Sequence, residues 1–493
     1  MNKSFFKTAI IALLCLPLFF INVKSSHDWG DDFAQYIHQA KNIVKGIPQT
    51  NTGYIFNEQN PLFGPRCYPI GFPLLLAPVY AIAGNSIHSF DLLITSFLFL
   101  SAIIMFIFYR KHFSSLVAGI LVLVFIYNPF LLNFKMDIMS DIPFIFFLLL
   151  CTYLYQSLKP FNYQKALLLA LLAAFLISIR NIGVIFIITV FIDSMVHYFR
   201  NRKEIRSRIY GSKEVLFPLV IASGGLIGFI ILNKIIFHTS SDGFFSYSYF
   251  FDSSQIIHLI QKNLNYNVVT LRGFFETYNG NWNFISIICS TIIVAFIILG
   301  MIRKRSEHID FIDTLVLLYS GMVIIYPYSS AGIRFLLPVV PYFLYYSIIG
   351  MKSLKINLRM NHQILAVLFG TMILFTYKTQ WINILNTQDT IIQGPQEPEN
   401  QAAFDYIIHN LPEDARINFT KPRALALYAD RSAYCDVAGL SAADINDNMS
   451  DNNIGYILVN NDIADDSLKA FVRNPAYPMK VVWSNSKNTL YEK

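Results

Sequence analysis

The stretch 88–109 reads HSFDLLITSFLFLSAIIMFIFY and decides the fold, because most of its side chains are apolar. A hydrocarbon core about 30 Å thick is crossed by a helix of roughly 20 apolar residues. The stretch therefore predicts a membrane-spanning helix. About eleven such runs occur, near residues 5–23, 88–109, 113–132, 141–158, 164–179, 181–199, 215–237, 283–302, 311–327, 334–350 and 362–380.

The composition also indicates a membrane protein. Of 493 residues, 54% are hydrophobic and only 14% are charged, whereas about 25% are charged in a typical soluble domain. The net charge of +7 divides unevenly, because residues 395–493 carry 9 basic and 14 acidic side chains, which leaves +12 for the first 394 residues. These basic residues are spread between apolar runs, so they indicate topology signals and no nucleic-acid partner.

Alternate connections between the runs are rich in Lys and Arg, as the positive-inside rule requires of cytoplasmic loops. These connections are 110–111, 159–165, 200–213, 303–305 and 352–359. The pattern predicts a multi-pass protein with a cytoplasmic N-terminus. The outer segments are then 24–87, 133–140, 238–282, 328–333 and 381–493. No signal-peptide cleavage site follows the first run, so we expect that run to remain as a helix.

The apolar runs end before Pro395, and short strand-like stretches then alternate with helix-like ones. Residues 415–419, 455–459 and 479–483 have the pattern of strands, and a helix is expected from Pro422. The sequence thus predicts two domains. A transmembrane module covers 1–394, and a small soluble α/β domain covers 395–493, outside the cytoplasm.

Asp31 and Asp32 lie in the first outer segment, a few residues beyond the first run. The apolar spacing through Phe33, Tyr36 and Ile37 predicts an amphipathic helix along the membrane surface. Both carboxylates would then stand at its N-terminus, where the helix dipole favours anions. Capping of this helix explains either residue as well as a catalytic role does.

A second acidic cluster, Asp137 and Asp141, falls on the same outer side, just before the run at 141–158. Ser140 or Asp141 could be a helix N-cap with Pro143 in the first turn. An ionisable residue at the mouth of a span also costs insertion energy, which favours a functional role.

Four arginines lie where the positive-inside bias disfavours them, namely Arg66, Arg180, Arg272 and Arg334. A guanidinium offers a two-pronged donor for phosphate, so a group of these residues could hold a lipid phosphate or pyrophosphate. Snorkelling toward anionic head groups is the alternative for each of them.

Two further features concern proline and aromatic residues. Three prolines and a glycine within 68–78 predict a broken segment that lines protein or a cavity. The aromatic runs at 244–251 and 277–282 suit either sugar stacking or an interfacial belt.

The sequence holds no P-loop, G-x-G-x-x-G, H-E-x-x-H or G-x-S-x-G motif, so nucleotide chemistry, zinc proteolysis and serine hydrolysis are not indicated.

Five short motifs follow one another along the chain. They are Asp31-Asp32-x-x-x-Tyr36, Tyr68-Pro69-x-Gly71-x-Pro73, Met139-Ser140-Asp141-x-Pro143, Arg334-Phe335-Leu336-Leu337-Pro338-x-x-Pro341 and Pro422-Arg423-x-x-x-Leu427-Tyr428-x-x-Arg431. Because these five motifs occur in this order, the chain resembles bacterial membrane glycosyltransferases of the GT-C class. More narrowly, it resembles the family-39-like group that contains protein O-mannosyltransferases and lipid A aminoarabinose transferases. The resemblance covers nearly the whole chain and implies a GT-C-like fold.

Enzymes of this group take a sugar from a polyprenyl-phosphate carrier and pass it to an acceptor outside the cytoplasmic membrane. By this resemblance Asp31 matches the catalytic base, and Asp32 matches its neighbour, which is usually Glu; the division of labour between them stays open. Gln35 stands where many relatives carry a basic residue. The candidate substrate-binding residues are Tyr36, Arg66, Tyr68, Asp141, Arg180 and Arg334. No cofactor is indicated, and a divalent cation is left open.

The expected function is therefore an inverting hexosyl- or pentosyltransferase of the bacterial cytoplasmic (inner) membrane, acting on a glycan, lipid or protein acceptor. A phosphate leaving group needs cationic stabilisation, while the attacking hydroxyl needs a base on the opposite face of the sugar. The competing function is a transporter or flippase of lipid-linked sugars, although few ionisable residues lie at mid-span. A binding tail anchored by the helices is a third interpretation, but about eleven spans exceed what an anchor needs.

Overall fold

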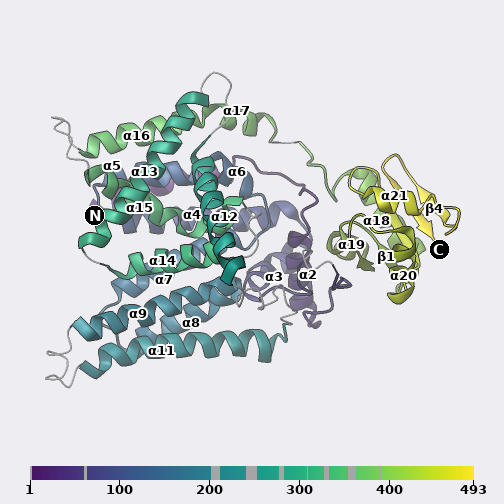
Figure 1. Ribbon diagram of the computed structural model, residues 1–493, viewed down its shortest axis with the longest axis horizontal. Coiled ribbons are helices and arrows are strands. Elements are labelled where there is room, and N and C mark those ends of the chain that lie inside the picture. The colour runs from purple at the N-terminus through teal and green to yellow at the C-terminus, as the bar shows by residue number, and fades with distance from the viewer. Residues whose placement is uncertain are drawn as a thin grey trace.

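The computed structural model describes residues 3–59, 64–200, 211–239, 253–276, 283–307, 309–326, 332–353, 362–388 and 390–493. Long helices lie side by side at one end of the molecule, and a five-stranded sheet with its own helices forms the other end (Figure 1). Helices α2 (Asp32–Lys45) and α3 (Gly71–Ala83) lie between these two parts.

The helical part contains most of the described elements. They are α1 (Lys3–Cys15), η1 (Leu16–Phe19), α2, α3, α4 (Ile87–Tyr109), α5 (Ser115–Ile126), α6 (Pro129–Phe134), α7 (Asp141–Ser157), α8 (Tyr163–Ile179), η3 (Asn181–Gly183), α9 (Val184–Arg200), α11 (Gly211–Ile230), the π-helical η4 (Ile231–Ile236), α12 (Ser253–Phe275), α13 (Asn283–Glu307), α14 (Phe311–Ile325), η7 (Gly332–Phe335), η8 (Leu337–Val339), α15 (Val340–Ser353), α16 (His362–Thr376) and α17 (Lys378–Asn386).

Among the described residues, five helical stretches are long and apolar enough to cross a membrane. They are Ile87–Tyr109, Asn181–Phe199, Leu216–Ile236, Phe284–Lys304 and Gln363–Asn386. Shorter apolar helices of 10–17 residues accompany them. The larger number of about eleven spans stays a prediction. Several apolar runs are not single long helices, because turns divide them; the run 113–132, for example, breaks at Asn128, which caps α6.

Two segments that the sequence predicts to lie outside the membrane differ in structure from the sequence-based expectation. The stretch 68–78, expected to be broken, enters the continuous helix α3 at Gly71. Pro73 lies in the first turn of α3, where a missing N–H costs no helical hydrogen bond. The segment 238–282, expected to be a loop, contains the 23-residue helix α12. Its aromatic runs 244–251 and 277–282 lie outside the described residues.

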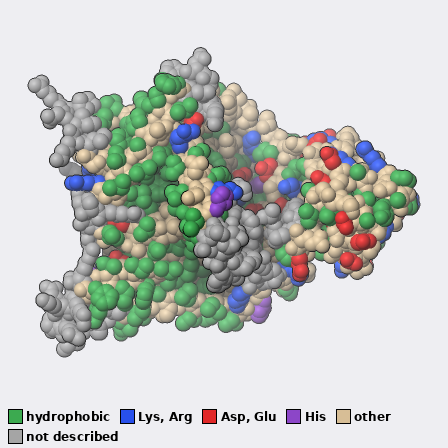
Figure 2. All heavy atoms as spheres, in the orientation of Figure 1, with side chains coloured by type: hydrophobic (Ala, Val, Ile, Leu, Met, Phe, Trp, Pro, Cys, Tyr) green, Lys and Arg blue, Asp and Glu red, His purple; other side chains and the backbone are tan. Residues whose placement is uncertain are grey.

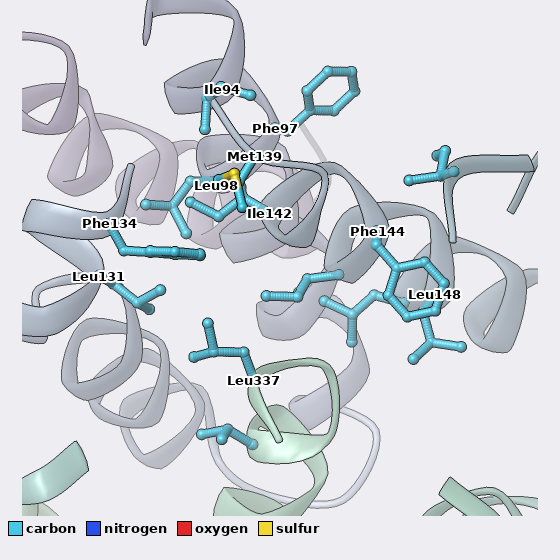
Figure 3. Close-up of a cluster of buried hydrophobic side chains, with 14 of the residues drawn as sticks. Ile94, Phe97, Leu98, Leu131, Phe134, Met139, Ile142, Phe144, Leu148 and Leu337 are labelled. Carbon is cyan, nitrogen blue, oxygen red and sulfur yellow. The ribbon is translucent and has the colours of Figure 1, made fainter. Parts of the chain in front are cut away.

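Apolar packing fixes the backbone where the second acidic motif begins α7. Ile94 and Leu98 of α4, Phe134 of α6, Ile142 of α7 and Leu337 of η8 belong to one buried cluster (Figure 3). Helix α7 and the turns η7 and η8 are far apart in the sequence, yet this cluster holds them together. Polar residues at the start of α7 and in η7 are therefore carried on a rigid frame.

The C-terminal part is built around a mixed sheet. Its elements are α18 (Pro398–Asn410), β1 (Arg416–Asn418), α19 (Pro422–Ala429), β2 (Ser432–Tyr434), α20 (Ala442–Asp451), β3 (Tyr456–Asn460), α21 (Asp466–Phe471), β4 (Lys480–Ser484) and β5 (Asn488–Glu492). The strand order is β2-β1-β3-β5-β4. Strand β1 pairs in parallel with β2 and β3, and β5 pairs antiparallel with β3 and β4. Strands β1, β3 and β4 and helix α19 lie where the sequence predicts them.

The segment between α2 and α3 extends this sheet beside β2. Tyr54 forms a parallel bridge with Ala433. The N–H of Ile55 donates to the carbonyl of Ala433 at 2.8 Å, and the N–H of Ala433 donates to the carbonyl of Gly53 at 2.9 Å. The two parts of the molecule are therefore joined by backbone hydrogen bonds as well as by side chains.

The surface separates into two kinds. Hydrophobic side chains cover much of the helical end, whereas acidic and basic side chains gather over the C-terminal end (Figure 2). This distribution fits a helical part surrounded by lipid and a C-terminal part surrounded by water.

Candidate functional site

Helix α2 begins at Asp32, as the apolar spacing predicts, but protein encloses it on several sides. Residues 33–42 are all buried. Helix α3 packs against α2 from the membrane part, and α19 packs against it from the C-terminal part. Lys41 Nζ also binds Asp430 Oδ1 at 2.8 Å. The expected membrane-surface helix is therefore a buried connection, because the C-terminal part covers the face that would meet the surface.

Asp31 occupies the N-cap position of α2 but makes no capping hydrogen bond to that helix. Its Oδ1 instead accepts the N–H of Ala424, in the first turn of α19, at 3.2 Å. Its Oδ2 lies 3.8 Å from Arg423 Nε and accepts no hydrogen bond. The side chain is only 8% exposed. This burial raises the pKa of Asp31 to about 6, although the Arg423 cation opposes the shift.

Asp32 is more open, with 35% of its side chain exposed. Its Oδ1 accepts a hydrogen bond from the hydroxyl of Tyr68 at 2.5 Å and another from Arg423 Nη1 at 3.1 Å. The two neighbouring acids therefore differ in their surroundings. Asp31 keeps one oxygen without a donor, whereas Asp32 is oriented by two donors.

Arg423 was not among the candidate residues, although it stands in the fifth motif. Its side chain is 0% exposed, and it faces both Asp31 and Asp32. Nη2 donates to the carbonyl of Pro65 at 2.9 Å, and the guanidinium carbon lies 4.8 Å from the ring centre of Tyr54. Removing one partner of a buried ion pair typically costs about 3–5 kcal/mol. Arg423 thus fastens the C-terminal part to the two acids.

Tyr36 and Tyr68 connect the acids to a second polar cluster. Their rings stack with centroids 4.4 Å apart. The hydroxyl of Tyr36 lies 3.3 Å from Ser140 Oγ, and Ser140 directly precedes Asp141. The first three motifs of the sequence therefore meet at one place.

Asp141 is fully buried and holds two of the four arginines. It forms an ion pair with Arg180 through Oδ1 and another with Arg334 through Oδ2, the latter at 3.2 Å. The side chains of Arg180 and Arg334 remain 19% and 30% exposed. One carboxylate cannot neutralise two guanidinium groups, so the cluster keeps a net positive charge. Ser140, at the N-cap position of α7, makes no capping hydrogen bond, and Asp141 binds arginines instead of capping the helix.

Close packing of α3 against α8 sets the position of Arg180. A Cβ on Gly71 would lie 2.6 Å from the carbonyl carbon of Ser178, so the two backbones approach too closely for any other residue. Asn233 joins the same two segments, accepting the N–H of Ile70 at 2.9 Å and donating to Ser178 Oγ at 2.8 Å. Arg180 directly ends α8. The glycine of the second motif therefore helps to place the arginine.

The other two arginines stand apart from this cluster. The exposed side chain of Arg66 lies over the ring of Phe56, 6.0 Å from its centre. The carbonyl of Arg66 accepts a hydrogen bond from the side-chain amide of Gln35. Arg272, in the last turn of α12, pairs with Glu276, the first residue after that helix, at 3.2 Å. The structure thus brings together Asp31, Asp32, Tyr36, Tyr68, Asp141, Arg180 and Arg334 and leaves Arg66 at the margin.

A metal site is not evident in the described part of the chain. No group of three or more His, Cys, Asp or Glu side chains there is arranged to hold a metal ion. A cavity of about 350 Å³ lined by Arg110, Lys111 and Lys352 lies at the opposite ends of the helices, so it does not belong to this site.

Comparisons with known proteins agree with this fold. A family model described as a predicted membrane protein (DUF2079) matches residues 33–480. The structure of ArnT from Cupriavidus metallidurans bound to undecaprenyl phosphate is similar, with 11% identity, a TM-score of 0.55, and coverage of 100% of this chain and 98% of that chain. The same ArnT in the apo state gives 11% identity and a TM-score of 0.57, covering 99% of this chain and 98% of that chain.

An oligosaccharyltransferase from Archaeoglobus fulgidus, in complex with Zn and sulfate, is also similar. It is 12% identical, with a TM-score of 0.56, and the match covers 99% of this chain and 73% of that chain. No curated protein matches the sequence. Because these neighbours are GT-C enzymes, the GT-C-like fold implied by the five motifs is confirmed.

Proposed function

Because the family match spans most of the chain, the protein belongs to the DUF2079 family of predicted membrane proteins, and we propose that it is an inverting glycosyltransferase. Its donor is a sugar carried on polyprenyl phosphate, and its acceptor is an extracytoplasmic glycan, lipid or protein. The undecaprenyl phosphate bound to the similar ArnT structure supports this class of donor.

One observation carries the proposal. A pair of acids, one with a buried carboxylate oxygen that accepts no hydrogen bond, stands beside two partly exposed arginines that share a single aspartate. The stacked rings of Tyr36 and Tyr68 join the two clusters. A base and a cationic phosphate site are the two parts that transfer from a sugar phosphate requires.

The proposed reaction assigns each cluster one task. Arg180 and Arg334 bind the carrier phosphate and stabilise the negative charge that develops on it as the glycosidic C–O bond breaks. Asp31 takes the proton of the acceptor hydroxyl as the new C–O bond forms on the opposite face of the ring, which inverts the anomeric centre. Asp32 and Tyr68 orient the sugar beside the base.

A transporter or flippase of lipid-linked sugars is the alternative function. Transport generally places ionisable side chains near the middle of the spans. Within the described helices, Asp91 and Asp313 are buried, but Asp313 lies in the first turn of α14 and Asp91 is the fifth residue of α4. This placement near helix ends favours the enzyme.

Mass spectrometry of cell-envelope glycans, lipids and glycoproteins tests the proposed function. Deleting the protein should remove one sugar from one envelope component, and the wild-type chain but not its Asp31→Asn variant should restore that sugar. The lipid-linked donor should remain accessible on the outer leaflet in the deletion. A donor confined to the inner leaflet would instead support the flippase.

The site and the C-terminal part share one side of the membrane, which we propose is the outside. The basic connections at 110–111, 159–165 and 303–305 support a cytoplasmic N-terminus. An alkaline phosphatase reporter fused after residue 390 should be active, and one fused after residue 205 should be inactive. The reverse activities would place the site in the cytoplasm and contradict a donor taken from the outer leaflet.

A further inference from the structure

A cavity of about 120 Å³ opens in the C-terminal part at the carboxyl ends of its parallel strands. Asn418 and Thr420 line it from the end of β1, Asp436 from beyond β2, and Asp465 and Ser467 from beyond β3. In the order β2-β1-β3-β5-β4, the connection that leaves β1 runs to β2 on one side, whereas the connection that leaves β3 runs to β4 on the other side. Ligands of open α/β sheets bind in the crevice that such a reversal creates.

The lining of this cavity suits an uncharged, hydroxyl-rich ligand. It contains carboxylate, amide and hydroxyl groups but no Lys or Arg. The amides of Asn418 and Asn448 donate to opposite oxygens of Asp436, at 2.6 and 2.8 Å. Carboxylate, amide and hydroxyl groups are the side-chain groups that hydrogen-bond the hydroxyls of a sugar. Ile445 and Leu468 add an apolar wall against which the C–H groups of a ring can pack.

The cavity lies close to Asp31. Phe419 stands between the lining residues Asn418, the last residue of β1, and Thr420, and its ring contacts Trp29, with centroids 5.7 Å apart. Asp31 itself binds the N–H of Ala424. Ala424 is only four residues beyond Thr420, a separation that an extended chain spans in about 14 Å. A short acceptor can therefore occupy the cavity and reach the carboxylate of Asp31.

We propose that this cavity is the acceptor subsite and that it binds an uncharged sugar of a glycan acceptor. The inference rests on the proposed glycosyltransferase function and specifies its acceptor class. An anionic acceptor is disfavoured, because Asp31, Asp32, Asp436 and Asp465 would all repel it and residues 395–493 carry 14 acidic against 9 basic side chains. The volume of the cavity is close to that of four water molecules, at about 30 Å³ each. It is therefore large enough for the polar edge of one sugar ring.

Saturation-transfer NMR on the purified full chain tests the subsite directly. The probes are the neutral disaccharides chitobiose, cellobiose and mannobiose, with glucuronic acid and a Ser/Thr-rich peptide as competing classes. Ala438 lines the cavity and is exposed, so Ala438→Phe should block its mouth without disturbing the core. Binding of a neutral disaccharide should weaken about ten- to a hundredfold in this variant, as expected for lost hydrogen bonds to a charged group.

Two further variants separate blocking from misfolding. Thr420→Val removes one lining hydroxyl and should weaken binding less than Ala438→Phe does. Ala443→Phe adds the same ring to an exposed position of α20 outside the cavity and should leave binding unchanged. Equal binding in Ala438→Phe and Ala443→Phe, or selection of glucuronic acid or the peptide, would overturn the proposal.

The same probes distinguish this proposal from the proposed function. Asp31→Asn should lose glycosyl transfer yet still bind the disaccharide. If glycosyl transfer occurs and Ala438→Phe leaves the acceptor KM unchanged, the proposed acceptor subsite is wrong, but the proposed glycosyltransferase function is retained. If no donor supports glycosyl transfer but Ala438→Phe weakens binding of the disaccharide, the proposed enzymatic function is wrong and only the sugar-binding site is retained.

Discussion

Replacing Asp31 with Asn is expected to lower the rate of glycosyl transfer by about 10² to 10⁴, or roughly 3 to 5.5 kcal/mol of barrier, the usual contribution of a general base. An amide oxygen at this position can still accept the N–H of Ala424. Folding and donor binding should therefore persist. The amide cannot take the proton of the acceptor hydroxyl, so turnover should fall. Steady-state kinetics of the purified protein with a polyprenyl-phosphate sugar measures the change.

The burial of Asp31 also predicts a pH dependence. The base must be ionised to act, and burial raises the pKa of Asp31 to about 6. The value of kcat/KM should therefore be constant above this pKa and fall about tenfold for each pH unit below it. An acid limb centred near 4, the ordinary value for Asp, would show that the base is a more open carboxylate.

A purely structural role for Asp31 makes the opposite forecast. The structure shows Asp31 bound to the first turn of α19, and Asn caps helices about as well as Asp does. In that case Asp31→Asn would keep turnover within about threefold of the parent, well below the contribution of a general base. The matched variant is Asp32→Asn, since Asp32 shares Arg423 with Asp31. A large loss of turnover in Asp32→Asn but not in Asp31→Asn would assign the role of general base to Asp32.

The sequence predicted those features that depend on local pattern. The apolar run 88–109 became the long helix α4, and the spacing after Asp32 became helix α2. Strands β1 and β3 also lie where alternation indicated them. Each of these signals comes from the spacing of neighbouring side chains, which does not depend on the rest of the fold.

The partners within the site could not be read from local pattern. Arg423 meets Asp32 across 391 positions of sequence, and Arg334 meets Asp141 across 193 positions. The sequence placed four arginines on the outer side, but only packing of α3 against α8 selects Arg180. The burial of α2 was missed for the same reason, because the covering helix α19 lies in the other part of the chain.

Replacing Arg334 with Ala is expected to weaken use of the lipid donor. Arg334 shares the buried Asp141 with Arg180, and its Nε–H donates no hydrogen bond to the described residues. This N–H is therefore available to a phosphate oxygen. A hydrogen bond to a charged group contributes about 1.5–3 kcal/mol, so the donor KM should rise roughly ten- to a hundredfold. Stabilisation of the developing charge on phosphate should lower kcat as well.

Two variants show whether donor binding depends on the planar pair of donors in the Arg334 guanidinium or only on its charge. Arg334→Lys keeps the charge but loses the planar pair of donors, so its donor KM should lie between those of the parent and Arg334→Ala. Arg272→Ala is the matched control, because Arg272 is 43% exposed and its ion pair is with Glu276 instead of Asp141. Snorkelling toward anionic head groups would make all three variants alike. Unchanged donor KM and kcat in Arg334→Ala would therefore remove Arg334 from the phosphate site and leave that role to Arg180.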